Sequence, residues 1–73
     1  MKIHKATKIT FEALGKEHVV YTDHQDHDYI QDQVHQICPT AFVNNICTDV
    51  ISKEEFLSNN LENLVQWNLK LKR

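Results

Sequence analysis

Polar and apolar residues alternate with a period of two near the start of the chain, a pattern typical of half-buried β-strands. Residues 9–13 alternate in this way, and residues 18–22 are rich in β-branched and aromatic side chains, which favour strands. Gly15-Lys16 lies between them and fits the two-residue loop of a type II′ turn, which takes glycine first. The pattern therefore predicts a β-hairpin.

This loop would also fix the register of the hairpin. The predicted cross-strand pairs are Leu14 with Glu17, Phe11 with Val20, and Lys8 with Asp23. The predicted apolar face consists of Ile3, Ile9, Phe11, Ala13 and Val20. On the other face, an exposed ion pair between Lys8 and Asp23 would stabilise the hairpin by less than about 1 kcal/mol.

Residues 26–38 place apolar side chains at helical spacing and predict a helix. Asp26 or Asp23 can cap its N-terminus, where Asp28 would interact favourably with the positive end of the helix dipole. Pro39 would end the helix, because the residue before a proline is disfavoured in the α region. The expected apolar stripe consists of Tyr29, Ile30, Val34, Ile37 and Cys38.

Residues 41–51 are rich in strand-forming side chains and predict a third strand. The Asn44-Asn45 pair is unfavourable within a strand and indicates a bulge or a turn near its start. Ser52 and, three residues later, Glu55 form a capping box, which predicts that a helix begins at once.

The last ten residues are compatible with two structures. Apolar and polar side chains alternate strictly, as in a strand, and a helical stripe can also continue through the segment. The apolar positions are Val65, Trp67, Leu69 and Leu71. One helix over residues 53–72 would be about 30 Å long, out of scale with so small a domain. We favour a helix near 53–62 and a strand near 64–72.

The sequence therefore predicts an α+β fold in a single domain over residues 1–73. Its elements would be an N-terminal β-hairpin, a helix, a strand, a short helix and a C-terminal strand, in the order ββαβαβ. The alternative order is ββαβα, with a helical C-terminal segment. A chain of 73 residues is shorter than the length at which globular chains usually divide, and its core is thin.

A chain this short offers little room for catalysis. An enzyme needs a cleft that excludes water and further residues that hold its catalytic groups in place, and few chains of this size supply both. The single glycine is already required by the predicted hairpin, so no glycine-rich phosphate loop can form, and no nucleophile turn is present. We expect a protein that is not an enzyme and that binds no cofactor.

One segment contains residue types that bind metals, since imidazole and thiolate are the preferred ligands of zinc. The candidate ligands are His24, His27, His35 and Cys38. The predicted helix would hold the two pairs about 10 Å apart along its axis, and would turn His35 toward solvent and Cys38 toward the core. We therefore expect no metal, and interpret the segment as a solvated helix start.

Two cysteines, Cys38 and Cys47, are too few for a disulfide-rich secreted protein. No apolar run is long enough to span a bilayer, and the N-terminus lacks the apolar region of a signal peptide. We expect a cytoplasmic protein with reduced thiols and no membrane partner. A disulfide between Cys38 and Cys47 is the less favoured alternative.

The net charge of −2 is unevenly distributed, because both ends are basic and the middle is acidic. Such a dipolar surface favours oriented docking over general binding of polyanions. We predict a non-catalytic module that binds a protein partner through the acidic hairpin–helix edge or an unpaired sheet edge. A sheet edge can also pair with a second copy of the chain. The candidate partner-binding residues are Glu17, Asp23, Asp26, Asp28 and Asp32.

The alternative hypothesis is a small nucleic-acid-binding module that uses the basic ends, with Trp67 and Tyr21 as stacking faces. The residues that would bind nucleic acid are Lys2, Lys5, Lys8, Lys70, Lys72 and Arg73. A pI of 6.2 and a single arginine favour the protein-binding hypothesis, since nucleic-acid modules are usually basic.

In size and in its Asn-, Lys- and Ile-rich composition, the chain resembles small accessory proteins of phages and mobile elements, anti-CRISPR proteins among them. This resemblance implies an inhibitor that binds a larger host complex and blocks it.

Overall fold

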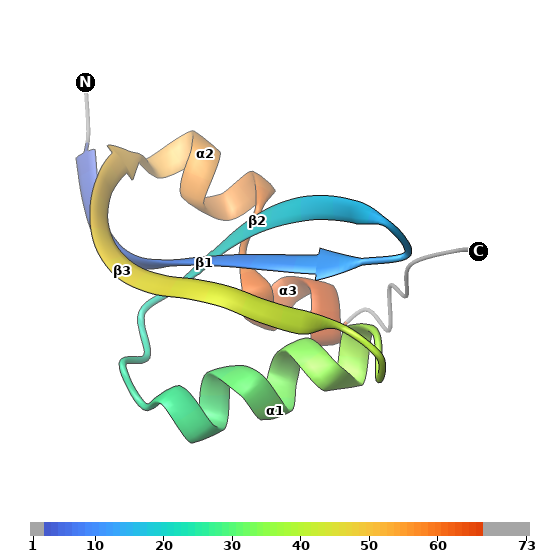
Figure 1. Ribbon diagram of the computed structural model, residues 1–73. Helices are drawn as coiled ribbons and strands as arrows, with labels where there is room; N and C mark the ends of the chain where they lie inside the picture. Colours follow the sequence, from blue (N-terminus) through green and yellow to red (C-terminus); the bar gives the residue numbers. More distant parts are fainter. Residues whose placement is uncertain (1–2, 67–73) are drawn as a thin grey trace.

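The computed structural model describes residues 3–66, which form one three-stranded antiparallel sheet and three helices (Figure 1). The elements are β1 (Ile3–Ala13), β2 (Lys16–Thr22), α1 (His27–Ile37), β3 (Phe42–Ser52), α2 (Lys53–Ser58) and α3 (Leu61–Gln66). The α+β class is confirmed, as are the N-terminal hairpin, the helix, the third strand and the short helix that follows it.

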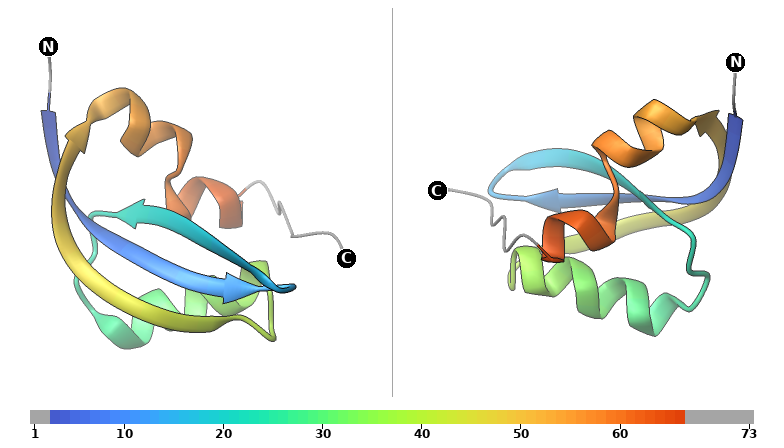
Figure 2. Two further views of the ribbon diagram at one scale, coloured as in Figure 1. Left: turned by 45° about the horizontal axis from the view of Figure 1, so that its top comes forward. Right: turned by 180° about the vertical axis from the view of Figure 1, so that it is seen from behind.

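The strand order is β2-β1-β3, so the first strand of the chain is the central one. Both neighbours run antiparallel to β1, and therefore parallel to each other. Helix α1 connects them by crossing one face of the sheet, where α3 lies beside it (Figure 2). Phe56 of α2 packs on the other face, against Ala6, Tyr21 and Ile51.

The main core lies between the sheet and the helices α1 and α3. Its fully buried side chains are Ile9 and Phe11 from β1, Ile30 and Val34 from α1, and Leu61 from α3. The predicted hairpin face is confirmed at Ile9, Phe11, Ala13 and Val20. Ile3 is 70% exposed, because the start of β1 projects away from α1 (Figure 1).

The predicted hairpin register is wrong by two residues. The turn consists of Leu14 and Gly15, with φ of 55° and 78°, and not of Gly15-Lys16. Lys8 lies opposite Tyr21, while Asp23 lies beyond the end of β2. A slip of two residues leaves every side chain on its predicted face, so the alternation of polar and apolar residues does not distinguish the two registers.

The other predicted pairs change in the same way: Phe11 lies opposite His18, Glu17 lies opposite Glu12, and Val20 lies opposite Ile9. The rings of Phe11 and His18 stack at a centroid distance of 5.3 Å. The observed register therefore gains an aromatic cross-strand pair, a contact that stabilises sheets.

The helix predicted over residues 26–38 is confirmed. The Asp26 carboxylate caps α1 by accepting from the backbone N–H of Asp28 at 2.9 Å. The helix ends at Ile37, just before Cys38 and Pro39, and its buried stripe is the predicted one except that Tyr29 is half-buried.

Both local signals around β3 are also confirmed. Thr10 lies opposite Asn45 and Phe11 lies opposite Val43, so Asn44 is the additional residue of a β-bulge. The Ser52 hydroxyl accepts from the N–H of Glu55 at 3.1 Å and caps α2.

The helix predicted over residues 53–62 is interrupted at Asn59 and Asn60, which separate α2 from α3. The N–H of Tyr21 donates to the carbonyl of Asn59 at 2.9 Å, and the Asn60 side chain then caps α3 by accepting from the N–H of Asn63. Residues 64–66 are helical, so the predicted strand is wrong at its start. Residues 67–72 of that strand lie outside the described residues.

Candidate functional site

The two outer edges of the sheet differ. The edge of β2 is covered at Tyr21, which bonds to Asn59 and forms a parallel bridge with Asn60. Within residues 3–66, no strand pairs with the outer edge of β3. Only Ile51 is buried among the eleven residues of β3. An open strand edge presents a row of backbone donors and acceptors with which another strand can pair.

The direction of the backbone groups of β3 follows from one hydrogen bond. The N–H of Val50 donates to its neighbour's carboxylate, that of Asp49, at 2.8 Å, so it points away from β1. Because backbone N–H groups alternate in direction along a strand, those of Ile46 and Thr48 also point outward. Asp49 therefore occupies one outward donor, and within residues 3–66 no strand pairs with the next two.

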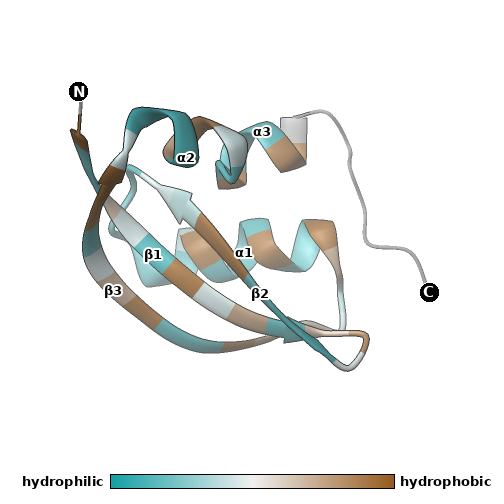
Figure 3. Ribbon diagram, turned by 90° about the horizontal axis from the view of Figure 1, so that it is seen from above, coloured by the Kyte–Doolittle hydropathy of each residue, from teal (hydrophilic) through white to brown (hydrophobic). Residues whose placement is uncertain are grey.

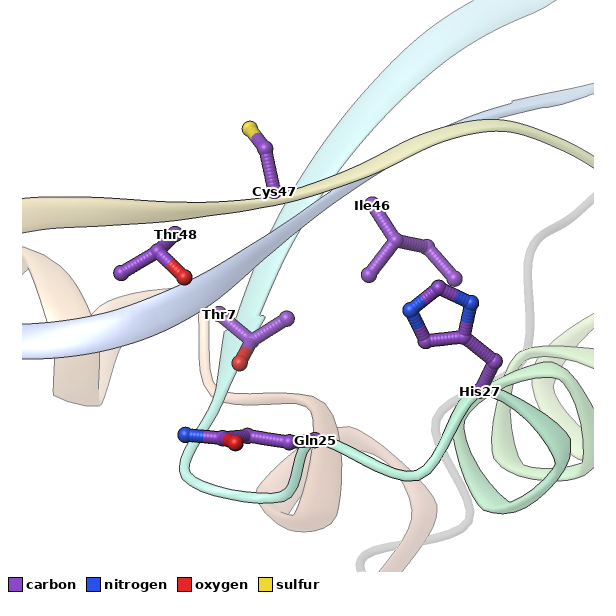
Figure 4. A pocket seen from close by; sticks show the side chains of 6 residues that line it. All are labelled: Thr7, Gln25, His27, Ile46, Cys47 and Thr48. Carbon is purple, nitrogen blue, oxygen red and sulfur yellow. The ribbon is translucent and has the colours of Figure 1, made fainter.

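A hollow, which we name the β3–α1 trough, lies between β3 and the first turns of α1 (Figure 4). Its two adjoining parts have volumes of about 200 and 260 Å³ and share His27 and Ile46. In Figure 4 these two side chains point toward each other, whereas Cys47 points to the opposite side of β3. The other lining residues include Thr7, Gln25, Gln31, Val43 and Thr48.

The trough exists because α1 does not fully cover β3. The apolar stripe of α1 packs with α3 and the core of the sheet, and leaves Val43 and Ile46 only half-buried. Figure 3 shows apolar and polar bands alternating along β3. An added strand beside β3 would cover the apolar positions that face α1.

Two of the predicted acidic residues directly follow residues of α1 that line this trough. His27 and Gln31, one turn apart on α1, line it, and each is followed by an aspartate, Asp28 and Asp32. A helix turns by about 100° per residue, so both carboxylates lie on the solvent side of the lining residues. Both side chains are exposed.

The remaining acidic residues have other positions. Asp26 caps α1, and the Asp23 carboxylate lies 2.6 Å from Nε2 of His4, whose ring packs on Phe56. Glu17 lies opposite Glu12 near the hairpin turn, on the sheet face that α1 does not cover. The fold thus places four of the five predicted residues on α1 or in the segment just before it, and separates Glu17 from them.

The described part of the chain does not bring the basic residues together. Lys5 and Lys8 lie three positions apart on β1, and so on opposite faces of the sheet. Tyr21 is 5% exposed, so its predicted use as a stacking face is wrong. The other residues of that hypothesis, Lys2, Trp67, Lys70, Lys72 and Arg73, lie outside the described residues.

The four candidate metal ligands have separate contacts. His24 packs on Tyr29, His27 faces the trough, Nε2 of His35 lies 3.0 Å from the carbonyl of Ala41, and Cys38 is buried. Within residues 3–66, no three His, Cys, Asp or Glu side chains lie close enough together to hold a metal ion. Cys47 is an exposed free thiol, so the alternative disulfide with Cys38 is not formed.

The carboxylate of Glu62 is not among the predicted site residues, yet it joins three elements of the fold. Its Oε2 accepts from the hydroxyl of Thr22 at 2.6 Å and from that of Tyr29 at 3.1 Å. Burial and this carboxylate raise the pKa of Tyr29, and burial together with Glu55 raises that of Tyr21. No periodic pattern marks Glu62, because its partners lie 40 and 33 positions earlier in the chain.

Comparisons of the chain with models of protein families, with curated proteins and with solved structures found no match. No helix among residues 3–66 has the length and the hydropathy needed to cross a membrane. Within residues 3–66, the open edge of β3 and the trough beside it form the candidate binding surface.

Proposed function

We propose that this chain is a non-catalytic protein-interaction module that captures an extended segment of a partner protein along the outer edge of β3. The observation that supports this proposal is the contrast between the two sheet edges: within residues 3–66, the edge of β2 is covered at Tyr21, whereas no strand pairs with the outer edge of β3. In strand addition, backbone hydrogen bonds supply affinity, and pockets for alternate side chains supply specificity.

The trough supports the same proposal. Alternate side chains of an added strand would project toward α1. They would enter the part of the trough that His27 and Gln31 line. They would cover Ile46 and Val43, which the fold leaves half-buried. The prominent polar network, by contrast, serves the fold, since Glu62 joins β2, α1 and α3.

Strand capture also suits an inhibitor. A small chain that pairs with a segment of a larger complex occupies that segment and keeps it from its normal contact. We therefore extend the proposal to a module that blocks a larger host complex, in line with the composition of the chain.

A proline at the edge tests the proposal. Thr48→Pro removes an outward N–H, a position at which edge strands tolerate proline, and should leave the fold intact. Gln36→Ala, an exposed change on α1, is the control. Affinity capture from a lysate of the native host should recover a defined protein with the native chain and with Gln36→Ala, and lose it with Thr48→Pro. Equal capture by a folded Thr48→Pro variant would place the interface elsewhere.

A further inference from the structure

We infer that the segment captured by β3 is a short, basic strand of another protein that combines apolar side chains with Lys or Arg. This inference rests on the proposed function and specifies the chemistry of its partner. Three features support it: the short available length of the edge, the side chains that face the trough, and the carboxylates of α1 and β3.

The available length of the edge is limited at both ends. The Asp49 carboxylate holds the outward N–H of Val50, and the bulge at Asn44 interrupts the regular ladder at the other end. Regular pairing therefore extends over about Asn45 to Thr48. The trough lies beside this same stretch, so backbone pairing and side-chain contacts would coincide.

The trough-facing side of the added strand requires apolar side chains. Ile46 lies opposite the buried Ile9, on the face of the sheet that α1 covers, and is itself half-buried. A valine or isoleucine next to Ile46 would remove its remaining apolar surface from water, which stabilises the complex.

The two elements that border the trough carry charges of one sign. Helix α1 and strand β3 contain three carboxylates, Asp28, Asp32 and Asp49, and no lysine or arginine. Lys5 of the neighbouring strand β1 lies opposite Val50, beyond the trough-lining Thr48. Asp28 and Asp32 are exposed on α1, one turn apart, and each directly follows a residue that lines the trough. A long Lys or Arg side chain on the added strand can lay its aliphatic part over the trough and bring its charge to these carboxylates.

The same charges disfavour a second copy of the chain as the occupant. Its β3 has no basic residue to offer and carries Asp49, and its α1 would bring a second pair of aspartates near the first. Like charges in an interface reduce its stability.

Three nine-residue peptides test the inference. The first is acetyl-Thr-Val-Thr-Lys-Thr-Lys-Thr-Val-Thr-amide, and the other two carry Gln or Glu in place of both Lys residues. Titration into isotope-labelled chain, followed by NMR, should shift the amides of residues 43–48 most strongly with the Lys peptide. The double variant Asp28→Asn/Asp32→Asn should weaken binding of the Lys peptide by about three- to tenfold and leave that of the Gln peptide unchanged.

The matched control is Glu12→Gln/Glu17→Gln, which removes the same two charges from an exposed pair on the far face of the sheet. It should change the affinity for the Lys peptide by less than about twofold. An equal loss in both double variants would overturn the inference, since only the net charge would then matter.

The remaining outcomes separate the inference from the proposed function. If all three peptides bind equally at residues 43–48, the chemistry inferred here is wrong and strand capture stands. If none shifts these amides at millimolar concentration, both fail. If the same amides shift with chain concentration alone and sedimentation gives a dimer mass, the occupant is a second copy, and the inference is overturned.

Discussion

Tyr29 on α1 and Glu62 on α3 are joined by a hydrogen bond of 3.1 Å, with the phenol as donor and the carboxylate as acceptor. The same carboxylate oxygen accepts from Thr22, a fully buried residue at the end of β2. One side chain thus connects a strand and two helices that are distant in sequence. Removing it would leave two hydroxyl groups without their acceptor.

Glu62→Ala should therefore destabilise the fold by about 2–3 kcal/mol, because an unsatisfied buried donor loses its full solvation. Glu62→Gln keeps an acceptor oxygen and should cost less. Urea unfolding monitored by circular dichroism measures both. Glu54→Ala, at an exposed position in the first turn of α2, is the control. An equal effect of Glu54→Ala and Glu62→Ala would contradict the role given to Glu62.

Stability should fall at alkaline pH through Tyr21 and Tyr29. The folded pKa of each phenol is raised above the ordinary value of 10.0, so the folded state holds the proton more tightly than the unfolded state. The stability that the two protonated phenols contribute is complete below about pH 10 and is lost as pH rises through their raised pKa values. Between pH 8 and 11.5, the melting temperature of Tyr29→Phe should fall less steeply than that of the native chain. Thermal unfolding over this pH range measures both. Parallel profiles would show that this phenol does not couple ionisation to folding.

Substitutions at the two residues of the hairpin turn, Leu14 and Gly15, should change the stability of the fold in opposite directions. Leu14 has a φ of 55°, which is unfavourable for leucine and acceptable for asparagine, so Leu14→Asn should stabilise the fold by about 0.5–1 kcal/mol. Gly15→Ala should cost about 1 kcal/mol through its φ of 78° alone, since an added Cβ meets nothing within 4 Å. Chemical denaturation measures both. A gain from Lys16→Asn instead of Leu14→Asn would favour the register expected from the sequence.

Asp49 should restrict pairing at the open edge. Asp49→Ala frees the outward N–H of Val50 and lengthens the exposed ladder, so self-association should strengthen by about five- to tenfold for each hydrogen bond gained. Asp49→Asn keeps the acceptor and should behave more like the native chain. Sedimentation velocity over a range of concentrations compares them. Identical behaviour of the alanine and asparagine variants would assign the effect to charge instead.

Local signals were sufficient for much of this fold. The Asp26 cap, Pro39, the Asn44 bulge and the Ser52 cap each depend on residues a few positions apart. The sequence indicated all four, with Asp23 as an alternative cap and a turn as the alternative to the bulge. The break at Asn59 was not indicated, because it depends on a bond to Tyr21, far away in the chain.

The candidate site was predictable only in part. Composition indicated an acidic surface, and the structure places Asp28 and Asp32 together on α1. Which edge of the sheet is open depends on the strand order, and no local pattern shows that β1 is central. Glu17 was grouped with the other acidic residues by proximity in sequence, whereas the hairpin directs it to the far face.

The central position of β1 also affects how the chain folds during synthesis. Ile3 pairs with Ser52, so β1 acquires its second neighbour only after β2, α1 and β3 have been made. The β1–β2 hairpin can form early, but one side of β1 then stays exposed until β3 arrives. Contacts so distant in sequence slow folding, and we expect the pairing of β1 with β3 to be the slow step in forming the sheet.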